Sequence, residues 1–122
     1  MAYTHRDGRV VMVTPPATID ARVVSDLVGE LERYLALGQP YTILFDLGGA
    51  GTPAAAERRR LAAHISENDA AIRTLVRGMA LVSPSTLLRG AFTATLWLSP
   101  LPVPHRIFGD RDEALRWLRS LQ

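Results

Sequence analysis

Cysteine and lysine are both absent from the 122 residues of this sequence. Without cysteine the chain has neither disulfides nor thiolate metal sites, which is compatible with a reducing compartment. The first residues, MAYTHRDGRVV, also lack the apolar segment of a secretory signal. These absences favour a cytoplasmic protein.

A long apolar run is missing as well. The most apolar helix candidate is Thr86–Leu98. A helix of that length spans roughly 20 Å at about 1.5 Å per residue. The hydrocarbon core of a membrane is roughly 30 Å thick. We therefore expect no membrane span.

A strong charge of either sign is also lacking. All 14 basic residues are arginines, and the net charge is +2, which is too small to indicate a nucleic-acid partner. The arginines divide evenly between residues 1–72 and 73–122, whereas most acidic residues lie in the first part. The carboxyl-terminal part is therefore mildly basic.

The residues that are present suit one folded domain. The hydrophobic fraction of 48% is sufficient for a single core, and we expect one domain over residues 1–122. Strands are predicted at 1–5, 9–14, 41–47, 77–82 and 105–108. Helices are predicted between a cap at Thr18 or Asp20 and Gly38, from Pro53 to Asn68, at 70–75 and 86–98, and after Asp110. This order predicts an α/β fold with a four- to five-stranded mixed, mostly parallel sheet and about four helices.

The segment Tyr41–Arg60 has the strand, glycine turn and helix of an α/β unit. Such turns are where α/β folds place their sites. Thr52 is expected to cap the following helix and Pro53 to occupy its first position. The buried face of that helix is predicted at Leu61, Ala62 and Ile65.

Polar candidates gather where two predicted strands end. Asp46 ends one strand, and Ser83 and Ser85 follow the next. They can form a polar rim around a ligand, or they can satisfy turn and cap amides. The loop with Gly48 and Gly49 can present amides to an anion, or it can be a tight turn that needs positive φ.

The helix candidate 86–98 is apolar nearly all round its circumference. It is either ordinary core, or it covers an apolar cleft or meets a partner through Phe92 and Trp97. A homodimer is one way to cover such a face. Arg89 in this helix and Arg106 beyond it are candidates to meet an acidic headgroup.

Three segments carry a family resemblance: Ile43–Gly48 (ILFDLG), Gly78–Ser85 (GMALVSPS) and His105–Leu118 (HRIFGDRDEALRWL). They resemble the STAS domain in its SpoIIAA-like branch, which is grouped with the CRAL-TRIO lipid-binding fold. The resemblance implies the SpoIIAA-like fold over nearly the whole chain. It also implies a regulatory module that binds a protein partner, as anti-sigma-factor antagonists do.

One departure from that family concerns its phosphorylated serine. The antagonists carry Asp-Ser-Ser-Gly at the start of the helix after the signature loop. The matching positions here are Ala54–Glu57, which contain no hydroxyl. The resemblance therefore implies a module without that switch. Thr52 is the nearest hydroxyl, and helix capping alone accounts for it.

No catalytic set is evident in the sequence. His5, His64 and His105 share no ligand spacing and accompany no nucleophile motif. We expect no metal, no cofactor and no enzymatic activity. The two functions left open are a regulatory or protein-interaction module, including self-association, and binding of a lipid or small apolar ligand beside 86–98.

Overall fold

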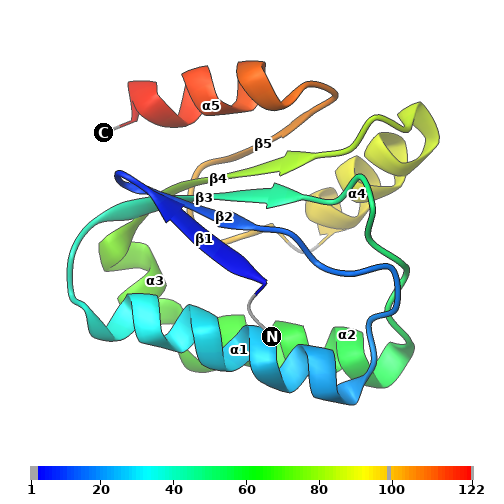
Figure 1. The fold of residues 1–122 in the computed structure, drawn as a ribbon, viewed down its shortest axis with the longest axis horizontal. Coiled ribbons are helices and arrows are strands. Elements are labelled where there is room, and N and C mark those ends of the chain that lie inside the picture. Colours follow the sequence, from blue (N-terminus) through cyan, green and yellow to red (C-terminus); the bar gives the residue numbers. More distant parts are fainter. Residues whose placement is uncertain (1–2, 99, 122) are drawn as a thin grey trace.

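The computed structural model describes residues 3–98 and 100–121, which form one five-stranded sheet with helices around it (Figure 1). The strands are β1 (Thr4–Asp7), β2 (Val10–Val13), β3 (Tyr41–Asp46), β4 (Val76–Val82) and β5 (His105–Phe108). They lie side by side in chain order; β1 pairs antiparallel with β2, and the other pairs are parallel. The α/β prediction is confirmed. Residues 1 and 2 of the predicted edge strand lie outside the described residues.

The helices are α1 (Ala21–Ala36), α2 (Ala55–Glu67), α3 (Asp69–Leu75), α4 (Thr86–Leu98) and α5 (Arg111–Ser120). One face of the sheet is covered by α1, α2 and α3, and the opposite face by α5 (Figure 1). Each face has its own core cluster, centred on side chains such as Val11 and Ile43 on the α1 side and Leu44 and Ala80 on the α5 side. Five described helices slightly exceed the predicted number. No described helix has both the length and the apolar character needed to cross a bilayer.

Two helix starts follow directly from the sequence. The Asp20 side chain accepts a hydrogen bond from the Val23 amide at 2.9 Å and caps α1. The Asp110 side chain accepts one from the Glu113 amide at 3.2 Å and caps α5. Such caps satisfy amides that have no partner within the helix.

The predicted start of α2 is wrong, and its predicted buried face is right only in part, because Leu61 and Ile65 pack against the core cluster on the α1 side. The helix begins at Ala55, its N-cap is Ala54 without a side-chain bond, and Thr52 is no cap. Ala62 is exposed, whereas His64 is buried. The spacing of apolar residues could not identify His64 as buried, because His64 is polar and its burial depends on contacts with other helices.

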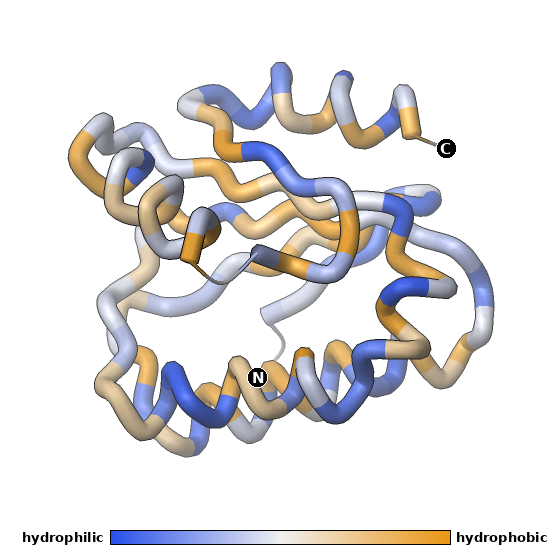
Figure 2. Tube along the Cα trace, turned by 180° about the vertical axis from the view of Figure 1, so that it is seen from behind, coloured by the Kyte–Doolittle hydropathy of each residue, from blue (hydrophilic) through white to orange (hydrophobic). Residues whose placement is uncertain are grey.

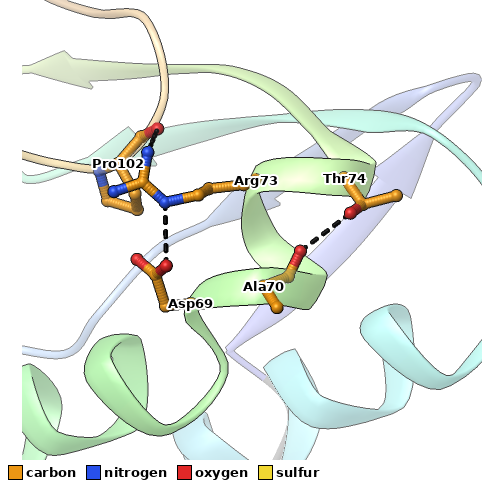
Figure 3. Close-up of polar contacts among 5 residues, drawn as sticks. All are labelled: Asp69, Ala70, Arg73, Thr74 and Pro102. Atoms are coloured by element: carbon orange, nitrogen blue, oxygen red, sulfur yellow. Dashed lines mark hydrogen bonds and ion pairs between the residues drawn. The ribbon is translucent and has the colours of Figure 1, made fainter.

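Residues 101–104, which precede β5, pack in part against the α1 side of the sheet. Val103 is buried in the core cluster on the α1 side. The Arg73 guanidinium lies between the Asp69 carboxylate at 2.8 Å and the Pro102 carbonyl oxygen at 3.3 Å (Figure 3). A second local bond, from the Thr74 hydroxyl to the Ala70 carbonyl oxygen, supports the same helix. The helix α4 lies toward the carboxyl ends of the strands, apart from the helices that cover the two sheet faces (Figure 1).

Candidate functional site

The loops after four neighbouring strands meet at the carboxyl edge of the sheet. The Leu47 amide donates to the Val82 carbonyl oxygen at 2.8 Å, and the Ser83 amide donates to the Phe108 carbonyl oxygen at 3.0 Å. The structure therefore brings together Asp46 and Ser83, as the parallel sheet predicts. This edge is where ligands bind in many open α/β sheets.

Asp46 at this edge is occupied by its own turn. Its Oδ1 accepts a hydrogen bond from the Gly48 amide at 3.2 Å. Its Oδ2 lies 3.9 Å from Nη1 of Arg111, at the start of α5. The carboxylate thus orders the loop and links it to α5, which favours the turn interpretation.

The glycine loop is shaped by close approach instead of by unusual backbone angles. Among the described residues, only Gly8 and Gly38 have positive φ. The expectation that Gly48 and Gly49 form a turn with positive φ is therefore wrong. At Gly51 a Cβ would overlap the carbonyl oxygen of Ala17, so the loop after β2 presses against it. Glycine is needed there for space.

The two serines stabilise local structure in a similar way. Ser83 is buried, and its Oγ accepts a hydrogen bond from the Ser85 amide at 3.4 Å. The Oγ of Ser85 accepts one from the Leu88 amide at 3.2 Å and so satisfies the first turn of α4. Thr52, by contrast, is exposed, and its hydroxyl has no hydrogen bond among the described residues.

Arg89 turns inward from α4. Its Nη1 donates to the Ser83 carbonyl oxygen at 2.7 Å, and its Nη2 donates to the Thr86 hydroxyl at 3.2 Å. A Cβ at Gly109 would come within 2.8 Å of the same Nη1. Arg106 is used elsewhere: its guanidinium lies over the ring of Phe108, 5.2 Å from the ring centroid. The structure does not bring the two arginines' charges together as one open headgroup site.

The helix α4 carries its apolar side chains on the outside. None of its residues is buried. Arg89, Phe92 and Leu96 are half-buried toward the domain, whereas Trp97 is 85% exposed and Leu98 is 88% exposed. The interpretation of this helix as ordinary core is therefore wrong.

The exposed apolar positions of α4 follow a helical spacing. All except Leu88, which is 41% exposed, recur at steps of three and four along one face: Leu87, Gly90, Ala91, Ala94, Trp97 and Leu98. Figure 2 shows the hydrophobic residues of α4, which stands apart from the helical layers that cover the sheet. We call these six residues the α4 stripe. A surface helix normally has polar residues on that side.

Two pockets lie at the opposite, amino edge of the sheet. One, of about 290 Å³, is lined by residues that include Arg6, Arg9 and Tyr41. The other, of about 280 Å³, adjoins it and includes Arg77. Residues of α4 line neither pocket, so neither supplies a cavity beside 86–98. Sequence reasoning missed this arginine grouping because its members lie far apart in the chain.

His64 is a second residue whose setting the sequence did not indicate. It is buried between helices, and its Nδ1 lies 3.2 Å from Nδ2 of Asn68 and 3.8 Å from Oε1 of Glu32. Burial lowers the pKa of His64, while Glu32 and Glu67 act in the opposite direction. Among the described residues, no three of His, Cys, Asp and Glu are grouped to hold a metal.

Comparison with known proteins establishes the fold. No protein-family model matches the chain, and no curated protein matches it by sequence. A crystal structure of an uncharacterized protein of the DUF3478 family from Shewanella loihica PV-4, with a SpoIIAA-like fold, is similar at a TM-score of 0.68. The two share 16% sequence identity, over 94% of this chain and 90% of the other. The fold of this chain is accordingly SpoIIAA-like.

Proposed function

We propose that this SpoIIAA-like domain is a non-catalytic protein-interaction module that docks through the α4 stripe. The observation that carries the proposal is the exposure of Leu87, Trp97 and Leu98, at 83%, 85% and 88%. Single exposed apolar residues are common, but an apolar stripe along one helix is typical of a surface that a partner covers. The first partner we propose is a second copy of the chain.

The distribution of charge on α4 is compatible with a second copy of the chain as the partner that covers the α4 stripe. Arg89 is the only ionisable residue of α4, and it is held inward by the Ser83 carbonyl oxygen. Two α4 helices related by a twofold axis therefore meet without like charges between them. The small residues Gly90, Ala91 and Ala94 lie on the same face and allow the helices to approach closely.

The area available predicts a weak dimer. Full burial of one large apolar side chain contributes about 1.5–3 kcal/mol. Leu87, Trp97 and Leu98 from two copies then contribute about 9–18 kcal/mol, against an association cost of about 4–15 kcal/mol. Because these two ranges overlap, we expect a weak dimer that forms at micromolar to millimolar protein concentration.

The proposal also includes regulation without a phosphoserine at the family's usual place. By resemblance, that place falls on Ala54–Glu57, where no side chain bears a hydroxyl. Ala54 and Ala55 form the start of α2 without a side-chain cap. Association is then governed by the concentration of the partner. Phosphorylation detected by mass spectrometry within this segment would contradict this part of the proposal.

Sedimentation velocity over a range of protein concentrations tests the docking surface. The variant Ala94→Glu places a carboxylate in the centre of the stripe and is expected to abolish the dimer. The matched control is Ala63→Glu, because Ala63 is likewise an exposed alanine within a helix, on α2. A wild-type protein that stays monomeric near 1 mM, or a dimer unaffected by Ala94→Glu, would overturn self-association through α4.

The alternative is that the same exposed side chains bind a lipid or another small apolar molecule. Native mass spectrometry of the purified protein distinguishes the two functions. An apolar ligand that co-purifies and is lost in Ala94→Glu supports the alternative, whereas a mass of two chains without ligand supports the dimer.

A further inference from the structure

Three arginines from two distant parts of the chain line two adjoining pockets at the amino edge of the sheet. Arg6 and Arg9 line the pocket of about 290 Å³, together with Tyr34 and Tyr41. Arg9 and Arg77 line the adjoining pocket of about 280 Å³. The two pockets share Arg9, Pro40 and Tyr41. We call these two adjoining pockets together the arginine cleft; the lining residues used below are Arg6, Arg9, Arg77, Tyr34, Tyr41 and Pro40. The turn after β1, the loop after α1 and the end of α5 converge there, on the left of Figure 1.

The guanidinium groups of the cleft are not neutralised by the protein. No acidic side chain lines either pocket. Within the described part of the chain, the side chains of Arg6, Arg9 and Arg77 form no ion pair or hydrogen bond. Other arginines do engage such partners: Arg73 pairs with Asp69, and Arg111 approaches Asp46.

Asp7 lies next to Arg6 in the sequence but on the other face of the strand. Arg6 is paired with Val11 and Asp7 with Val10. Val11 and Val10 belong to the core clusters on opposite faces of the sheet. Because side chains alternate along a strand, the Asp7 carboxylate is directed away from the pocket that contains Arg6.

The carboxyl ends of two helices lie at the cleft, and their partial negative charge offsets part of its positive charge. Leu37, the C-cap of α1, lines the first pocket, and Leu121, the C-cap of α5, lines the second. A helix carries about half a negative charge at its carboxyl end. Two such ends amount to about one negative charge against three guanidinium groups, so the cleft keeps a clear positive excess.

Apart from Gln39, the remaining lining is aromatic, apolar or glycine. The rings of Tyr34 and Tyr41 lie 6.2 Å apart at an interplanar angle of 44°. Burial, with a smaller effect of Tyr34, raises the pKa of Tyr41 to about 12, so its phenol remains neutral and adds no negative charge. Arginine offers paired donors that match phosphate and carboxylate, and it also stacks on flat rings.

We propose that the arginine cleft binds a small organic anion, with a phosphate or carboxylate group among Arg6, Arg9 and Arg77 and a flat apolar body against Tyr34 and Pro40. The site lies at the edge of the sheet opposite α4, so it is independent of the docking surface proposed above. A ligand of this kind uses both chemical features of the cleft.

Isothermal titration calorimetry at fixed ionic strength tests the site, with phenyl phosphate, inorganic phosphate and phenol as probes. Wild-type protein is expected to bind one phenyl phosphate per chain, more tightly than inorganic phosphate, and not to bind phenol measurably. Arg9→Gln is expected to weaken phenyl phosphate binding at least about tenfold, because it removes a charge-assisted donor. The matched control, Arg59→Gln, changes net charge equally on the exposed surface of α2 and should stay within about twofold.

Several outcomes would overturn the proposal. They are the absence of saturable phenyl phosphate binding, an equal loss in Arg59→Gln, equal affinity for inorganic phosphate, and binding to anionic lipid vesicles without binding to phenyl phosphate. Thermal melting of Arg9→Gln shows whether the variant is folded. Arg77→Gln provides a second test of the same cleft, with the same expected loss, should Arg9→Gln fail to fold.

Discussion

The Arg89 guanidinium donates a hydrogen bond of 2.7 Å to the Ser83 carbonyl oxygen and thereby attaches α4 to the end of β4. A Cβ at Gly109 would lie 2.8 Å from the same nitrogen, so the loop before α5 also closes around this side chain. The only charge of α4 is thus used to hold the helix in place. Its outer face consequently remains apolar.

Replacing Arg89 should loosen α4 while the sheet stays folded. Arg89→Met keeps an apolar stem but removes the hydrogen bonds to Ser83 and Thr86. Hydrogen exchange of amides in 86–98 should accelerate severalfold, and the free energy of unfolding should fall by about 1 kcal/mol. Arg116→Met is the control, because Arg116 is exposed on α5. Unchanged exchange in α4 would contradict this role of Arg89.

The buried Glu30 carboxylate should contribute more to stability than a surface acid. It accepts hydrogen bonds from the Tyr3 amide at 2.9 Å and from the Thr4 hydroxyl at 2.8 Å, so it fastens β1 to α1. Glu30→Gln removes the charge and places an NH2 group where Oε2 accepts from the Tyr3 amide at 3.1 Å, so it should cost about 1–3 kcal/mol in urea unfolding. Glu113→Gln, at an exposed position of α5, should change stability by less than about 0.5 kcal/mol. Equal effects of the two changes would refute this assignment.

Gly51 and Gly49 offer a matched test of close packing in the loop. An added Cβ at Gly51 would overlap the Ala17 carbonyl oxygen, whereas one at Gly49 would meet no atom within 4 Å. Neither glycine has positive φ. Gly51→Ala should destabilise the domain by about 1–3 kcal/mol, and Gly49→Ala should be close to neutral. The comparison is made by thermal and urea unfolding, and similar stability of the two variants would disprove the close approach.

His64 should make stability depend on pH. Burial lowers the folded-state pKa of His64 below its ordinary 6.5, so the unfolded chain takes up the proton more readily. The contribution of neutral His64 to the free energy of unfolding should therefore be complete above pH 6.5. It should be lost as the pH falls from 6.5 toward the folded-state pKa. His64→Gln should reduce this decline, whereas His5→Gln, at an exposed site, should retain it. Urea unfolding at a series of pH values measures both, and the same decline in His64→Gln would exclude His64 as the cause.

Several parts of the fold are readable from local sequence. The bounds of α4 and β5 are those predicted, and Asp20 and Asp110 cap their helices as their positions indicate. These features depend on residues within one or two turns of each other. The start of α2 was misjudged because Thr52 and Pro53 satisfy the usual preferences of a helix start, yet the contact of Gly51 with Ala17 holds the loop in another path.

The candidate sites depended on longer-range placement. The adjacency of Asp46 and Ser83 followed from parallel pairing, but the use of both residues within turns and caps is a feature of the tertiary structure. The apolar character of α4 was evident in the sequence, whereas its exposure was not. Its exposure depends on which distant residues pack against the helix, such as Gly109 beside Arg89.

By itself, the sequence determined the alternation of strands and helices, since hydrophobic periodicity and capping act between near neighbours along the chain. Only the tertiary structure decided which side chains share a surface. Arg6 and Arg9 come from one hairpin and Arg77 from a strand two positions across the sheet from β2, and they line adjoining pockets because pairing aligns the amino ends of β3 and β4. Tertiary contacts likewise hold α4 apart from the helical layers over the sheet (Figure 1), because Arg89 bonds the Ser83 carbonyl oxygen and lies against Gly109.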